Sequence, residues 1–460
     1  MIQWILLFIY ILSILSVIFI ERKNPTEAIL WVFVMICLPY VGTILYFIFG
    51  NTTLIKWIYT TRKKRLSQIH TDPMPKTTIG NLSSEDEQVM HFNYVYNQSA
   101  ITHYKTIQTY IDGKSHYEQL FKDIEQAKEN IYVEFYTIHN DCVGQAFQDA
   151  LCKKAKSGVN VYVLCDSFAN LSTPKKFFDP SIHVIRVKPY LTHYRSHRKI
   201  VVIDEDIAYI GGMNIGKQYA NMAKKKNPWR DTQVRLTGDC VQILLQYFLQ
   251  DWLCAVKKNE VDSVIEKIQS IAVPVRTSNQ NLCQFIVGGV NTNKESVKMV
   301  YLSMIRSAKN RIRIQSPYFI PDASILDALK TAAAAGIQIE LMIPGIEASF
   351  FLDPVTTYYS GQLLEYGAKV YKYNGYIHAK TMMIDDEICA IGSVNMDMRS
   401  LMVDDEICGI FYENTFVKEY SDIYDTDLLS CKPYTLQTYQ TRSQKEKMLE
   451  GFFLLFAPLM

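Results

Sequence analysis

The sequence has no large excess of charge of either sign. Its 48 lysines and arginines are balanced by 46 aspartates and glutamates, which gives a formal net charge of +2 at neutral pH. Proteins that bind nucleic acid usually carry a strong basic excess, because contacts to phosphates supply much of their affinity. The charge balance therefore predicts no nucleic-acid partner.

The chain also lacks the spacings that mark metal sites and disulfide frameworks. Its ten cysteines include no CxxC pair, and no HExxH segment occurs. Cys165, Cys389 and Cys408 stand in apolar, strand-like runs, where a free cysteine commonly acts as a small buried hydrophobe. We therefore expect a reducing compartment, no metal and no other cofactor.

Charged residues are missing altogether from two stretches near the N-terminus. Residues 1–20 contain none, and residues 28–50 form a second uncharged run of 23 residues. A helix of about 20 apolar residues crosses a bilayer, so these runs predict two transmembrane helices. The first run has no basic segment before it and a second apolar run soon after it, which favours a retained anchor over a signal peptide. A buried soluble hairpin is the alternative.

Basic residues are distributed unevenly around these two runs. Only two basic residues lie in the short loop between them, whereas five follow the second run closely. Since loops rich in lysine and arginine stay on the cytoplasmic side, we expect the large domain to lie in the cytosol. The five residues are Lys56, Arg62, Lys63, Lys64 and Arg65.

The remaining sequence contains an internal repeat. The segments SHRKIVVIDEDIAYIGGMN (196–214) and IHAKTMMIDDEICAIGSVN (377–395) place histidine, lysine, aspartate and asparagine at the same spacing. Their histidines, His197 and His378, are 181 positions apart, and the same offset relates QAKENIYVEFY to SAKNRIRIQSPYF. A common order of patterns at one offset indicates a duplicated domain.

Helix-like and strand-like patterns alternate from Ile111 onward, which predicts α/β layers around a largely buried sheet. The last twenty residues combine a charged front with an apolar back, which is typical of a helix docked on the core or of an amphipathic helix at a membrane interface. The expected organisation is two transmembrane helices in 1–50, a linker in 51–110, a first domain in 111–260, a connection in 261–291, a second domain in 292–430 and a tail in 431–460.

The repeated motif brings together groups that suit a phosphodiester. Residues i and i+2 of a strand share one face, so His197 projects with Lys199, and His378 with Lys380. If the two halves meet around a pseudo-two-fold axis, both pairs reach one site. There the cations neutralise the non-bridging oxygens, one imidazole attacks phosphorus and the other protonates the leaving alcohol. Further donors come from Asn214, Ser393 and Asn395.

The doubled H-x-K-x4-D motif followed by G-[GS]-x-N resembles the signature of the phospholipase D superfamily. The segments NPWRDTQVRL, DEICAIGSVNMDMRS and LPYVGTILYFIFG are similar to those of bacterial cardiolipin synthases. This resemblance implies two α/β/α lobes with the active site between them, behind an N-terminal transmembrane hairpin. It also implies that two phosphatidylglycerols from the bacterial cell membrane give cardiolipin and glycerol.

The resemblance further implies a role for each motif residue. His197 is expected to be the nucleophile and to form a phosphatidyl-histidine, while His378 is the general acid and then the base. The phosphate ligands are expected to be Lys199, Lys380, Asn214 and Asn395. A further acid orients each histidine in the family. Our candidates are Asp231 for the histidine of the first half and Glu406 for that of the second, whereas Asp204 and Asp385 brace the motif strands.

Three other functions are alternatives to a synthase. A phospholipase D, or another phosphatidyltransferase, delivers the phosphatidyl group to water or to a different alcohol. A nuclease on this motif would need a basic groove, which the charge balance argues against. A membrane scaffold with inactive motifs disagrees with the intact histidine, lysine, aspartate and asparagine positions in both copies.

Overall fold

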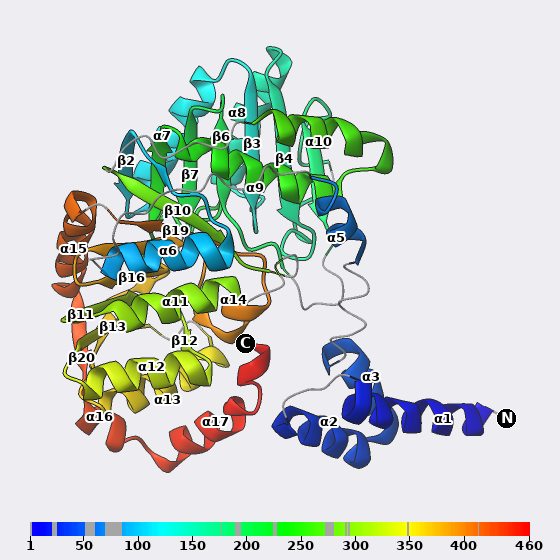
Figure 1. Cartoon of the computed structure of the whole chain (residues 1–460), viewed down its shortest axis with the longest axis vertical. Helices are drawn as coiled ribbons and strands as arrows, with labels where there is room; N and C mark the ends of the chain where they lie inside the picture. Colours follow the sequence, from blue (N-terminus) through cyan, green and yellow to red (C-terminus); the bar gives the residue numbers. More distant parts are fainter. Residues whose placement is uncertain are drawn as a thin grey trace.

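The computed structural model shows two α/β lobes, drawn one above the other in Figure 1, with the N-terminal helices beside them. The first lobe carries the cyan and green elements, and the second carries mainly yellow and orange ones. The described residues are 2–20, 25–50, 60–69, 85–174, 176–188, 195–223, 228–271, 280–289, 292, 295–346, 349–412 and 414–460.

Each lobe is built on one mixed sheet, and the two sheets share a strand order. The first runs β2-β9-β7-β6-β3-β4-β5, and the second runs β10-β19-β17-β16-β11-β13-β14 between the edge strands β1 and β20. In each sheet three consecutive strands are parallel, and the motif strand pairs antiparallel with the first of them. This repeated order confirms the duplicated α/β fold.

The strands of the first sheet are β2 (Thr106–Tyr110), β3 (Asn130–Phe135), β4 (Asn160–Asp166), β5 (His183–Val187), β6 (Ile200–Ile203), β7 (Ile207–Gly211) and β9 (Gln233–Thr237). Those of the second are β1 (Thr102–His103), β10 (Leu282–Val287), β11 (Arg311–Gln315), β13 (Gln338–Pro344), β14 (Lys369–Tyr373), β16 (Thr381–Ile384), β17 (Ile388–Gly392), β19 (Ile407–Phe411) and β20 (Cys431–Tyr434).

Helices cover the faces of both sheets, which explains why β6 (IVVI) and β16 (TMMI) are buried at every residue. Aspartate side chains cap equivalent helices: Asp141 caps α8 and Asp322 caps α12, each accepting hydrogen bonds from backbone N–H groups of the first turn. The helices of the lobes are α7 (Gly113–Gln126), α8 (Cys142–Lys156), α9 (Cys240–Ala255), α10 (Val261–Ser270), α11 (Ser296–Ser307), α12 (Ala323–Ala334), α13 (Leu352–Leu364), α14 (Met398–Met402) and α15 (Asn414–Leu428).

The two lobes share one hydrophobic core. Ile210 of β7 and Ile391 of β17 belong to the same buried cluster, together with side chains of α9 and α15. The approach is close at Gly409 of β19, where a Cβ atom would lie 2.8 Å from Cδ1 of Ile210. Because a common core fixes the lobes against each other, residues from both can form one precise site.

The domain boundaries differ from those expected. The segment 261–291, predicted to be a connection, contains α10 and also β10, which pairs with β19 inside the second sheet. The predicted linker 51–110 contributes β1 and β2 as edge strands, one to each sheet, as well as α5 (Thr60–Leu66) and α6 (Glu85–Asn97). Long-range pairing decides the place of these strands in the sheets, and local periodicity does not reveal it.

The C-terminal segment is part of the second lobe. β20 pairs antiparallel with β14 at the edge of the second sheet, followed by α16 (Leu436–Gln440), α17 (Gln444–Leu454) and the 3₁₀ turn η4 (Ala457–Leu459). Phe453 and Ala457 are buried against Ile320 and Val355, so α17 is docked by one face. Large apolar side chains are exposed on its other side and directly after it, namely Met448, Phe452 and Leu455. Contact of this surface with a membrane interface stays a prediction.

The N-terminal residues form α1 (Ile2–Leu15), the π-helical segment η1 (Ser16–Ile20), α2 (Pro25–Cys37), α3 (Pro39–Leu45) and the π-helical segment η2 (Tyr46–Gly50). Proline cannot donate a backbone hydrogen bond and favours the first helical turn, so α3 begins anew at Pro39. Among the described residues, no single helix combines the length and the hydropathy that crossing a bilayer requires. The transmembrane hairpin expected in residues 1–50 is therefore not confirmed.

Candidate active site

The histidine and lysine of each motif lie directly before a buried strand. The pattern predicted that these side chains lie within the strand. Since β6 begins at Ile200 and β16 at Thr381, they project instead from the segment that leads into it. Asp204 and Asp385 follow the same two strands. Each aspartate accepts hydrogen bonds from three consecutive backbone N–H groups, at residues 128–130 and 309–311, over 2.6–3.0 Å. Both aspartates thus brace the motif strands.

The backbone of each histidine is held by the opposite lobe. The N–H of His197 donates to the carbonyl of Asp405 over 2.9 Å, and the N–H of His378 donates to the carbonyl of Arg230 over 2.6 Å. Next to the second contact, β8 (Trp229–Arg230) pairs with β15 (Tyr376–Ile377), and a matching bridge joins Ser196 to Asp405. The two crossings are equivalent under the repeat, so the structure has the pseudo-two-fold arrangement expected of paired motifs.

The carboxylates beside the histidines also come from the opposite lobe, which reverses the expected pairing. Nδ1 of His197 lies 2.9 Å from Oε1 of Glu406, and Nδ1 of His378 lies 2.6 Å from Oδ2 of Asp231. Both predicted carboxylates contact a histidine, but each had been assigned to the histidine of its own half. The reason is the crossing of segments, which places residue 406 beside 197 and residue 231 beside 378.

The glycine and serine of the G-[GS]-x-N segments make room for these carboxylates. A Cβ atom at Gly212 would lie 2.2 Å from Oδ1 of Asp231, so a side chain there would displace that carboxylate. Ser393 occupies the equivalent position in the second motif, is fully buried, and donates a hydrogen bond from its hydroxyl to Glu406. Ser393 therefore supports the carboxylate, and it does not line the cavity where we expected it to bind phosphate.

The two carboxylates differ in their electrostatic environment. Although burial opposes it, the charges of His378 and Lys380 hold the pKa of Asp231 below its usual value. Burial raises the pKa of Glu406 to about 7, against the opposing charge of Lys199. At neutral pH, Asp231 is therefore ionised, whereas Glu406 is close to its titration point.

Both histidines are kept neutral at physiological pH. Burial, reinforced by the charges of Lys199 and Lys380, holds the pKa of His197 well below its usual value. Burial and the charge of Lys380 lower the pKa of His378 to about 4, against the opposing effect of Asp231. A neutral imidazole whose Nδ1–H donates to a carboxylate presents an unprotonated Nε2, which can act as a nucleophile or a base.

The two lysines lie beneath the histidines rather than on the cavity surface. Nζ of Lys199 donates to the carbonyl of His197, and Nζ of Lys380 donates to the carbonyl of His378. Burial lowers the pKa of Lys199 to about 7 and that of Lys380 to about 8. An added phosphate charge nearby would favour the protonated form of both lysines, and of both histidines as well.

The two motif asparagines line the cavity but differ in their contacts. Asn214 accepts from the N–H of Thr137 over 3.2 Å and donates to the hydroxyl of Tyr219 over 2.8 Å. Oδ1 of Asn395 is buried and has no hydrogen-bond partner in the described part of the chain. Asn395 is thus the better placed of the two to change partners on binding a ligand.

The histidines from the two lobes line a common cavity of about 460 Å³. Sequence reasoning missed its aromatic and arginine side chains. The available signal was nearness in sequence, because several of them stand within a few positions of a motif residue. In space, the ring centroids of Tyr136 and His197 are 5.0 Å apart, and those of Trp229 and His378 are 5.1 Å apart. The missed residues include Tyr136, Arg195, Tyr219, Trp229, Tyr318, Tyr376 and Arg399.

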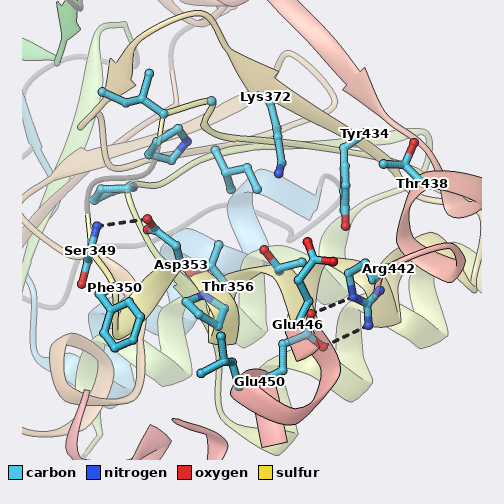
Figure 2. A pocket seen from close by; sticks show the side chains of 18 of the residues that line it. Ser349, Phe350, Asp353, Thr356, Lys372, Tyr434, Thr438, Arg442, Glu446 and Glu450 are labelled. Carbon is cyan, nitrogen blue, oxygen red and sulfur yellow. Dashed lines mark hydrogen bonds and ion pairs between the residues drawn. The ribbon is translucent and has the colours of Figure 1, made fainter. Parts of the chain in front are cut away.

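A larger cavity of about 730 Å³ lies beside α16 and α17, and neither histidine lines it (Figure 2). Its wall includes Lys372, Tyr434 and Arg442, and Nε of Arg442 pairs with Glu450 over 2.7 Å. Across the described ranges, histidine, cysteine and acidic side chains nowhere gather in the groups of three that could hold a metal ion. The cavity lined by the two histidines is our candidate active site.

Comparison with protein families gives two matches. A family model described as "Cardiolipin synthase, PLD-like domain" matches residues 120–252 and 301–428, which are the two lobes. A second model, described as "Phospholipase_D-nuclease N-terminal", matches residues 8–51. The first model thus covers most of both lobes, and the second covers most of the N-terminal helices.

Whole-length relatives point the same way. A cardiolipin synthase from Listeria welshimeri is 32% identical over 96% of this chain and 95% of its own length. The major cardiolipin synthase ClsA of Bacillus subtilis is 32% identical over 98% of this chain and 97% of its own length. Among solved structures, a phosphatidylserine synthase from Haemophilus influenzae has a similar fold, with a TM-score of 0.63 at 15% identity over 82% of this chain and 98% of its own.

Proposed function

Because the chain belongs to the cardiolipin synthase family of phospholipase D-like proteins, we propose that it transfers a phosphatidyl group from one phosphatidylglycerol to another, giving cardiolipin and glycerol. The observation that carries this proposal is the pair of neutral histidines, one from each lobe, on one cavity. Each has a carboxylate on Nδ1, so Nε2 of each is available for chemistry.

In the first half of the reaction, Nε2 of His197 attacks phosphorus and the bond from phosphorus to the glycerol oxygen breaks. His378 gives a proton to that oxygen, and glycerol leaves. In the second half, His378 takes a proton from the hydroxyl of the second phosphatidylglycerol. That oxygen attacks phosphorus, the phosphorus–nitrogen bond breaks, and cardiolipin leaves with His197 restored.

The difference between the two carboxylates supports this division of roles. An ionised Asp231 stabilises the imidazolium that His378 must form as a general acid. Glu406, whose pKa burial raises to about 7, carries less negative charge and favours a neutral His197 that attacks as a nucleophile. A phosphodiester bound near Lys199 and Lys380 would offset their repulsion of His378 and raise its pKa toward the working range.

The lysines and Asn395 are proposed to hold the phosphate. Each protonated lysine has three N–H donors and uses one on a histidine carbonyl, so two donors remain beneath the reacting group. A bound phosphate would favour this protonated form. Oδ1 of Asn395 is an acceptor, so a rotation of its amide would turn the donor end toward a phosphate oxygen. Preorganised positive groups of this kind favour the transition state over the ground state.

A lipid-product assay tests the proposed function. Purified full-length protein given phosphatidylglycerol alone should form cardiolipin and release glycerol in equal amounts. Phosphatidylethanolamine, whose head group has no hydroxyl to act as an acceptor, should give no cardiolipin and serves as the matched control. Phosphatidic acid as the main product would identify water as the acceptor and contradict a synthase.

We also propose that residues 1–50 hold the protein at the bacterial membrane, with the lobes on the cytoplasmic side. The described helices there expose large apolar side chains, among them Trp4 (74%), Phe8 (63%) and Phe33 (62%). Exposed apolar surface on this scale is typical of contact with lipid or another protein. The basic residues after position 50 would then face the cytosol.

Deleting residues 1–50 should release the protein from membranes and lower activity on bilayer lipid much more than on detergent-dispersed lipid. The physical reason is that the lobes would still reach lipid in micelles but would no longer be concentrated at a bilayer. Membrane fractionation and the two lipid assays measure the effect. Equal losses in both assays would indicate a role in folding instead.

A further inference from the structure

Two arginines line the cavity that contains the histidines, and they differ in their partners. Nη2 of Arg399 donates to Oδ1 of Asp404 over 2.9 Å, which neutralises that guanidinium. Among the described residues, no carboxylate forms an ion pair with Arg195. Its Nη1 donates to the hydroxyl of Tyr136 over 3.3 Å, and its Nε is buried with no hydrogen-bond partner. The charge of Arg195 acts on the carboxyl of Asp166, whose pKa burial raises, but the two form no ion pair. A half-buried guanidinium without an ion-pair partner, at the wall of a cavity, is suited to an anion.

The position of Arg195 is fixed beside the proposed nucleophile. Its carbonyl accepts from the N–H of Asp405 over 2.9 Å, and its own N–H donates to Oδ1 of Asp404 over 3.3 Å. The segment that delivers Glu406 to His197 therefore also anchors Arg195. The ring of Tyr136 lies edge-on to His197, and its hydroxyl accepts a hydrogen bond from the guanidinium of Arg195. The side chain of Tyr136 thus lies between the proposed nucleophile and Arg195.

The alcohol that leaves in the first half of the proposed reaction and the alcohol that enters in the second half differ in charge. The leaving glycerol is neutral. The incoming phosphatidylglycerol carries a phosphodiester of its own, separated from its attacking hydroxyl by one glycerol unit. A second phosphate must therefore come close to the first, and their repulsion in a partly buried cavity opposes binding unless a cation is present. Lys199 and Lys380 do not line the cavity and are already assigned to the first phosphate, so a second phosphate needs another cation.

We propose that Arg195 forms a subsite for the phosphate of the acceptor lipid and thereby favours an anionic alcohol over water or free glycerol. This inference rests on the synthase function proposed above. The planar guanidinium can bind a phosphodiester through two parallel N–H donors. A turn of the side chain would bring its Nε, which is buried without a partner in this structure, to the phosphate. Arg195 acts here as a specificity residue, because it contacts the acceptor away from the reacting phosphorus.

The test compares a charged and a neutral acceptor in the same micelles. Full-length protein receives phosphatidylglycerol together with labelled free glycerol, and two rates are measured: cardiolipin formation and exchange of label into phosphatidylglycerol. Both need the phosphatidyl-histidine, but only cardiolipin formation has a phosphate on the acceptor. In Arg195→Gln, the ratio of cardiolipin formed to glycerol exchanged should fall by about 10- to 100-fold, as expected for one charged hydrogen-bonding group.

Two further variants complete the comparison. Arg195→Lys keeps the charge and loses the planar fork, so it should restore part of the ratio. Arg306→Gln removes an exposed arginine at the end of α11 and should leave the wild-type ratio. An unchanged ratio in Arg195→Gln, a parallel loss of both rates, or a lysine variant no better than glutamine would each overturn the subsite.

The products formed by the wild-type protein distinguish a failure of this inference from a failure of the proposed synthase function on which it rests. A wild-type protein that makes phosphatidic acid and no cardiolipin would overturn the synthase assignment and the acceptor subsite with it. A wild-type protein that makes cardiolipin, combined with equal losses of both rates in Arg195→Gln, would overturn only the subsite and place Arg195 on the donor phosphate.

Discussion

Replacing His197 by alanine should abolish cardiolipin synthesis, and replacing His378 by alanine should lower it by at least about 10²- to 10⁴-fold, the range for loss of general acid–base assistance. The loss at His197 is expected to be larger, because no covalent intermediate can then form. Both side chains line the cavity and neither supports the core, so expression and membrane association should persist. His91→Ala, which removes an exposed histidine of α6, is the matched control.

A substrate with a better leaving group separates the two roles. A phosphatidyl ester of nitrophenol needs no proton for departure, so the first half of the reaction no longer depends on His378. His378→Ala should then release one nitrophenolate per active site, stop, and retain labelled phosphatidyl group on His197 after an acid-free quench. His197→Ala should show no burst and no label.

Two results would contradict these assignments. Label on His378, with none on His197, would reverse the roles of the two histidines. A full turnover rate without label on either residue would favour direct displacement over a covalent intermediate. Because a phosphoramidate is labile in acid, the quench must be neutral or basic for either result to count.

Neutralising the two cross-lobe carboxylates should have the second largest effect. Asp231→Asn and Glu406→Gln each keep the shape of the side chain and remove its charge, so we expect losses on the order of 10²-fold or more as proton transfer and imidazole orientation fail. The two variants should differ in kind. Asp231→Asn weakens His378, so with the nitrophenyl substrate label should accumulate on His197. Glu406→Gln weakens His197, so the burst itself should slow.

This difference distinguishes the observed pairing from a pairing within each half. If Asp231 supported His197, its asparagine variant would slow the burst, and Glu406→Gln would accumulate label instead. Because Asp231 acts through His378, the double variant Asp231→Asn/His378→Ala should be little worse than His378→Ala alone. Asp425→Asn, which changes an exposed carboxylate paired with Arg313, is the control for loss of an acidic charge.

The duplicated α/β fold and the motif residues could be predicted from the sequence because their signals are local. The spacing between His197 and Lys199 recurs between His378 and Lys380, and it can be seen in the sequence without knowing how the two lobes pack. Asp204 and Asp385 could be assigned to bracing because each follows its motif strand directly. The boundaries were less accurate, since β1, β10 and β20 join the second sheet through pairings with distant segments.

The sequence by itself determined which side chains are the candidates for the chemistry, through two copies of one pattern at a constant offset. The tertiary structure alone decided which of them meet. His197 and Glu406 are 209 positions apart, and His378 and Asp231 are 147 apart, and no repeat offset encodes either contact. They form because the shared core fixes the lobes so that residues 230–231 and 405–406 cross to opposite sides. The same docking places Arg195, which forms no ion pair with the described residues, on one cavity with His197, a property of the assembled cavity that local spacing does not contain.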